Sequence, residues 1–121
     1  MTTAVIVIAG VFFLGMGVYA LVAPAALVRP FRIVAGTPES RSEIRAVYGG
    51  FGVAIAAVLA AAALDVGGIR TGAVITVGAA LAGMALGRVL SRLADAATPF
   101  YPVWFYFWVE VVTAALLFSV A

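Results

Sequence analysis

Four apolar stretches, each long enough to cross a lipid bilayer, constrain this chain more than any other feature. A helix needs about 20 residues to span the roughly 30 Å hydrocarbon core of a membrane. The stretches cover residues 3–23, 44–64, 72–91 and 101–121. With their polar flanks they predict helices over about 3–23, 39–64, 71–93 and 101–121. We therefore expect an all-α fold, an integral membrane four-helix bundle in a single domain over residues 1–121.

The charge content agrees with this class. Hydrophobic residues make up 66% of the chain and charged residues 10%, whereas a soluble domain has about 25% charged residues. A chain this short cannot bury so much apolar surface behind a polar shell, so its core has to be shared with lipid or with other subunits. We expect membrane lipids as partners, together with self-association or other membrane protein subunits.

The longest connection between the predicted helices, residues 24–38, has the pattern of a segment that lies in the plane of the lipid headgroups. Two prolines interrupt helical structure there, and apolar residues alternate with Arg29 and Arg32. Thr37 followed by Pro38 predicts an N-cap and a first helical position. The second helix should therefore begin in the aqueous layer.

The arginines predict the orientation in the membrane. The second connection carries only Arg70, and six arginines lie beside the first and third connections: Arg29, Arg32, Arg41, Arg45, Arg88 and Arg92. Cytoplasmic loops carry an excess of basic residues. The first and third connections are therefore expected to be cytoplasmic, and both termini extracytoplasmic.

One carboxylate interrupts the last apolar stretch. It belongs to Glu110, in the run PVWFYFWVEVV over residues 102–112. An ionised side chain near the bilayer centre costs about 2.5–3.5 kcal/mol on insertion scales, so it usually faces a bundle interior and finds a partner there. Arg88 on the third span and Arg45 on the second lie at similar depth, and Tyr48 shares a helical face with Arg45. We predict a buried polar cluster of these four residues.

Three roles for this cluster stay open. The two arginines lie close enough to the interface to extend toward the headgroups, and a pair with Glu110 would then fix the register of the helices. Alternatively, the cluster handles a ligand or a proton. In the third case Glu110 faces a partner protein.

Small residues at helical spacing predict close contact between helices. Gly83 and Gly87 form a GxxxG match on the third span, and Gly49 and Gly50 lie on the second. We expect these glycines to serve packing within the bundle. A dedicated dimer face is the alternative.

Several kinds of chemistry are excluded by composition. The chain has no Cys and no His, which rules out disulfides, Cys/His zinc sites and Ser-His-Asp catalysis within it. The remaining hydroxyl nucleophiles have no His or Lys base beside them. We expect no enzyme activity, no cofactor and no metal.

The positive charges of the chain are arginines, and its net charge is +2. Arginines suit phosphates and carboxylates as partners. The sequence has no basic run interleaved with exposed aromatics, the pattern that would indicate nucleic-acid binding.

A set of short motifs in a fixed order resembles a known family. Pro24 follows the first span, EIRAVYGG (43–50) enters the second, GRVLSRLAD (87–95) closes the third, and Glu110 lies in the fourth. This order is similar to a bacterial family of four-helix membrane proteins, the domain of unknown function 4345, and the resemblance covers nearly the whole chain.

The resemblance implies the four-helix fold and a place in the bacterial cytoplasmic (inner) membrane, and it brings no activity. It also implies a set of shared polar and small positions: Glu43, Arg45, Tyr48, Gly49, Gly50, Gly87, Arg88, Ser91, Asp95 and Glu110. A looser likeness to DoxX-like four-helix proteins suggests quinone, sterol or lipid handling, as an analogy of fold.

Together these observations favour a small non-enzymatic membrane protein, in the first place an accessory or assembly subunit of a larger membrane complex. The alternative is a binder of a lipid- or quinone-like small molecule through the Arg/Glu cluster in the cytoplasmic leaflet. A proton-coupled small transporter is a third hypothesis. The intramembrane arginines disfavour it, because they would hold Glu110 ionised.

Overall fold

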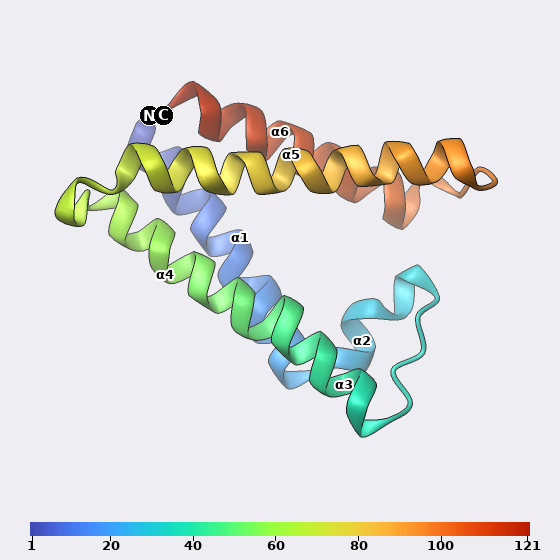
Figure 1. Cartoon of the computed structure of the whole chain (residues 1–121). Coiled ribbons are helices and arrows are strands. Elements are labelled where there is room, and N and C mark those ends of the chain that lie inside the picture. The colour runs from blue at the N-terminus through green and yellow to red at the C-terminus, as the bar shows by residue number, and fades with distance from the viewer.

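The computed structural model describes all 121 residues, and they are helical apart from short connections (Figure 1). Four helical segments are long and apolar enough to cross a membrane: Thr2–Val22, Pro38–Ala63, Arg70–Ala94 and Phe100–Ser119. The prediction of an all-α chain with four spans is confirmed.

The first span is α1 (Thr2–Val22) and the third is α5 (Arg70–Ala94). The other two are built from shorter helical pieces. The second span consists of α3 (Pro38–Ile44), the π-helical turn η2 (Arg45–Gly50) and α4 (Phe51–Ala63), and the fourth consists of η4 (Phe100–Trp104) and α6 (Phe105–Ser119). A short 3-10 turn, η3 (Val66–Gly68), lies between α4 and α5.

The spans pack as two antiparallel pairs, α1 with α4 and α5 with α6. Figure 1 shows that the pairs meet at the end that holds both termini and the α4–α5 turn, and that they diverge toward the other end. We call these the closed end and the open end. Both termini thus lie at the same end of the molecule. Their extracytoplasmic location stays a prediction.

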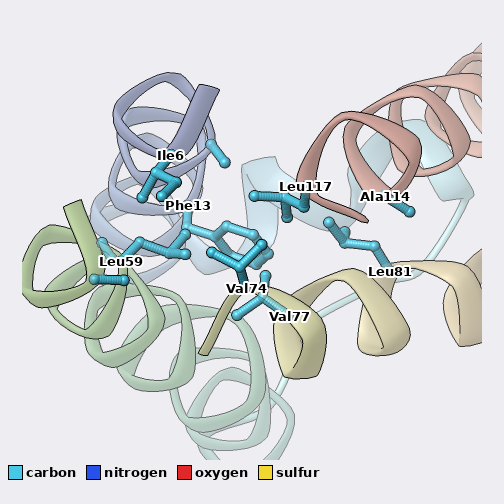
Figure 2. Close-up of a cluster of buried hydrophobic side chains, with 11 residues drawn as sticks. Ile6, Phe13, Leu59, Val74, Val77, Leu81, Ala114 and Leu117 are labelled. Atoms are coloured by element: carbon cyan, nitrogen blue, oxygen red, sulfur yellow. The ribbon is translucent and has the colours of Figure 1, made fainter. Parts of the chain in front are cut away.

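The largest apolar core lies at the closed end. Ile6 of α1, Leu59 of α4 and Leu117 of α6 are fully buried in it, and Figure 2 shows these side chains meeting those of α5. Away from this core, large apolar side chains such as Leu86 and Leu90 are exposed. In water so much exposed apolar surface would drive association. In a bilayer it is the surface that lipid covers.

Glycines allow α1 and α4 to approach closely. A Cβ added to Gly17 would lie 2.7 Å from the backbone N of Val53 and 2.9 Å from the carbonyl O of Gly49. A Cβ on Gly52 would lie 3.0 Å from the Cα of Gly17. Close backbone contact gains dispersion energy, which is the main attraction between helices in lipid. Gly49 is therefore part of a helix contact.

The other three glycines that were expected to pack are placed differently. Gly50, Gly83 and Gly87 are exposed, and a Cβ on Gly83 or Gly87 would meet no atom within 4 Å. The physical reason is the orientation of α5, which turns the face with Val74 and Leu81 toward the core. Gly83 and Gly87 lie on the opposite side of the helix. They make no helix contact within the chain.

The segment between the first two spans folds back on the open end of α1. It forms α2 (Pro24–Val28), a 3-10 turn η1 (Arg29–Phe31) and an extended stretch. A second, smaller core holds it there: Ala20, Val28, Ala35 and Ile44. The predicted N-cap is confirmed, since the Ser40 backbone N–H donates to Thr37 Oγ1 at 3.1 Å.

We expect the Gly17→Ala variant to lose about 1–3 kcal/mol of stability, the usual cost of overpacking, because the methyl group would have to displace the α4 backbone. Titration from mild detergent into SDS, followed by helix content, measures the loss. Gly15→Ala is the matched control, since Gly15 is exposed and a Cβ there meets no atom within 4 Å. Equal losses in both variants would contradict the contact at Gly17.

Candidate functional site

An ion pair joins α5 to α6. Arg88 Nε donates to Glu110 Oε1 at 2.8 Å, and Arg88 Nη2 donates to Glu110 Oε2 at 2.9 Å. The guanidinium fork thus meets both carboxylate oxygens, an arrangement that adds geometric specificity to a charge-assisted bond. The Glu110 side chain is 6% exposed and that of Arg88 is 21% exposed. The structure brings these two residues of the predicted polar cluster together.

The pair lies within the membrane-length part of both helices. Arg88 is about 9 Å from the C-terminal end of α5, at 1.5 Å per residue. Removing one partner of a buried pair leaves a charge without compensation, which costs about 3–5 kcal/mol. The pair is therefore a strong constraint on how α5 and α6 are aligned.

Aromatic residues cover one side of the pair. The Phe31 ring of η1 lies 5.7 Å from the Arg88 Cζ atom, at a distance typical of a cation–π contact. The same ring lies 5.6 Å from the ring of Tyr106 on α6. Phe31 thereby links the segment after α1 to the α5–α6 pair. It does so at the open end, where the two helix pairs diverge.

Arg45 and Tyr48 lie apart from this pair, in contrast to the predicted four-residue cluster. Arg45 Nε donates to the carbonyl O of Leu21 at 3.0 Å, and Tyr48 is 37% exposed. The second span packs against α1, whose last carbonyls lack partners within the helix. A cation at the C-terminal end of a helix also interacts favourably with the helix dipole. Arg45 therefore caps α1 instead of neutralising Glu110.

A cavity of about 190 Å³ opens beside Arg88, where α5 ends and the fourth span begins. At roughly 30 Å³ for each water molecule in the liquid, it would hold about six waters. Five of its eight lining residues are polar or charged. We call this space the Arg88 cavity, and it is lined by Arg88, Ser91, Arg92, Asp95, Ala96, Thr98, Val103 and Trp104. The space suits a small polar group and is too small for lipid acyl chains.

Four residues of this lining have a helical spacing that is visible in the sequence, but the predicted polar cluster was not based on it. Arg88, Ser91, Arg92 and Asp95 follow the i, i+3, i+4, i+7 spacing of one helix face. The expected cluster instead joined Arg88 to the distant Arg45. Trp104 comes from another element, and helical spacing alone does not give its position.

The fold and the site together fit one class, a small all-helical multi-pass membrane protein whose last two spans share an internal ion pair. Its family follows from a match that covers all 121 residues. Residues 1–121 match the family model described as Domain of unknown function (DUF4345), and the chain belongs to that family. No curated protein and no solved structure matches it significantly. The looser likeness to DoxX-like proteins stays an expectation.

We expect the loss of stability to differ according to which partner of the ion pair is replaced. Arg88→Leu should lose about 3–5 kcal/mol because it leaves the Glu110 carboxylate buried and unpaired. Glu110→Leu should lose less, because the Arg88 guanidinium can extend into the cavity and toward the headgroups. SDS titration measures both losses.

The double variant Arg88→Leu/Glu110→Leu should recover most of the stability that Arg88→Leu loses, since no charge is then left unpaired. Equal losses in Glu110→Leu and Arg88→Leu would contradict the expectation that an unpaired Arg88 guanidinium can extend into the cavity and toward the headgroups.

Proposed function

We propose that this protein binds the phosphate-bearing headgroup of a membrane lipid in the Arg88 cavity. The observation that carries the proposal is the convergence of two arginines on one cavity at the end of a membrane-spanning helix pair. Guanidinium groups bind phosphate oxygens through directed N–H donors. The hydroxyl groups of Ser91 and Thr98, on the same lining, add further donors.

Arg88 is suited to hold both Glu110 and a ligand. Its Nε and Nη2 atoms bind the carboxylate, and its Nη1 atom donates to no protein group. A guanidinium has five N–H donors in a fixed plane, so the pair with Glu110 orients the remaining donors. Glu110 is thus a positioning residue in this proposal.

The place of the cavity in the fold also supports a lipid. It lies at the helix ends, where the spans pass from apolar to polar residues, and Trp104 lines it. Tryptophan favours this depth because its ring is apolar and its N–H is polar. A lipid could place its headgroup in the cavity while its acyl chains stay in the bilayer, next to the exposed apolar surface of α5.

The geometry favours lipid binding over proton-coupled transport. A carboxylate that carries protons has to meet water during its cycle, whereas the whole Glu110 residue is 4% exposed and Arg88 engages both of its oxygens. Quinone-like ligands fit less well than phosphates, because they offer carbonyl oxygens without charge to a lining with two guanidinium groups.

We expect Arg92→Gln to reduce retention of dioleoyl phosphatidylglycerol about tenfold or more, because a hydrogen bond to a charged group contributes about 1.5–3 kcal/mol. Native mass spectrometry of the purified protein, with this lipid added, measures the retention. Arg29→Gln is the matched control, since Arg29 is also exposed and does not line the cavity. Equal retention by both variants would remove the cavity as the binding site.

A second function, as an accessory or assembly subunit of a larger membrane complex, is favoured by the outward face of α5. Gly83 and Gly87 lie there with no atom near their Cβ positions. A GxxxG pattern that is free on the surface lets a helix of another chain approach closely. Neither glycine lines the Arg88 cavity, although Gly87 directly precedes Arg88 in the chain.

For this second function, Gly83→Leu is expected to abolish copurification of a partner protein from native membranes, with the chain still folded. The control is Gly15→Leu, which places the same side chain at an exposed glycine of α1. Quantitative mass spectrometry of mild detergent extracts compares the two variants. A partner that persists with Gly83→Leu, or a wild-type protein that purifies alone, would count against the subunit role.

A further inference from the structure

We propose that the Arg88 cavity selects a lipid headgroup that carries both a phosphate and a primary ammonium group, as in phosphatidylethanolamine. In this proposal Arg88 and Arg92 bind the phosphate, and Asp95 binds the ammonium. The inference rests on the proposed lipid-binding function and names the class of lipid that the site would take.

The charge balance of the site points to a ligand without net charge. Arg88 and Arg92 line the cavity together with Asp95, and Glu110 binds Arg88 from within the helix pair. The two positive and two negative groups therefore cancel. A site for a purely anionic headgroup would keep an excess of positive charge.

Arg92 and Asp95 are not paired with each other. They are three residues apart, close enough for an ion pair along a helix, yet the one ion pair of the chain is that of Arg88 and Glu110. Asp95 leaves the helix, because it is the C-cap of α5 and has an extended backbone with φ −125° and ψ 172°. The cavity thus keeps an anionic and a cationic residue as separate ligand-binding groups.

The position of Asp95 is electrostatically unfavourable by itself. The C-terminal end of a helix carries a partial negative charge, so an acidic residue there is destabilised, by up to about 1 kcal/mol. An ammonium group beside Asp95 would interact favourably with both the carboxylate and the end of the 25-residue α5 helix. A bound cation therefore accounts for an acidic residue at this helix end.

The spacing fits a short zwitterion. Arg92 and Asp95 are three residues apart in the chain and line the same cavity, and the phosphate and ammonium of ethanolamine are joined by a short spacer. A primary ammonium also has three N–H donors for a carboxylate. The methylated ammonium of choline has none, so phosphatidylcholine should bind less well.

The test uses the purified full chain in mild detergent with equal amounts of dioleoyl phosphatidylethanolamine and dioleoyl phosphatidylglycerol, followed by native mass spectrometry. We expect the wild-type protein to retain phosphatidylethanolamine about tenfold more than phosphatidylglycerol, the scale of one charge-assisted hydrogen bond. Asp95→Asn should remove this preference, and Asp95→Glu should keep it. Glu43→Gln, at an exposed acidic residue outside the cavity, is the matched control and should also keep it.

Two outcomes would overturn the inference and leave lipid binding intact: equal retention of both lipids by the wild-type protein, or an unchanged preference in Asp95→Asn. Displacement of the lipid by soluble phosphoethanolamine at equal concentration would overturn the lipid as the source of the headgroup. Failure of the wild-type protein to retain any phospholipid would defeat the proposed function itself. Asp95 is exposed at a helix end, so its variants should fold, and gel filtration with circular dichroism checks this.

Discussion

A carboxylate buried between two membrane-spanning helices has to be neutralised from within, because lipid offers no hydrogen-bond donors. In this protein Arg88 supplies that neutralisation with two hydrogen bonds to Glu110. The ion pair also has a geometric effect. A bidentate pair fixes the plane of the guanidinium as well as the alignment of α5 and α6, so the remaining donors of Arg88 point in a set direction. Arg88 is the residue that the ion pair and the Arg88 cavity share.

Two different kinds of contact hold the two helix pairs. Backbone approach at Gly17 and Gly52 joins α1 to α4, and the ion pair joins α5 to α6. In lipid the hydrophobic effect does not favour helix association, so packing by small residues and polar contacts between helices have to supply it. The apolar core at the closed end then connects the pairs to each other. This division places the polar contact between the last two spans next to the Arg88 cavity at the open end.

The sequence predicted the local features well and the pairing of helices poorly. The four spans, the Thr37 cap and the pairing of Glu110 with an arginine each follow from length, capping preference or the cost of a buried charge, which act over a few residues or on one group. Arg45 and Arg88 were equal candidates by depth, because a helical pattern gives the face of a residue and not the neighbour of its helix. For the same reason the packing of Gly49 and the exposure of Gly83 were indistinguishable in the sequence.

Phe31 links the segment after α1 to the ion pair of the last two spans. The segment that carries it was predicted to lie in the headgroup plane, and it contacts both Arg88 and Tyr106. An aromatic ring over a guanidinium excludes water from that side, and the interaction of Arg88 with Glu110 strengthens as the local dielectric falls. The Arg88 side chain is 21% exposed, and Arg88 also lines the cavity. The open end therefore combines a buried carboxylate, an aromatic ring and the Arg88 cavity around one guanidinium group.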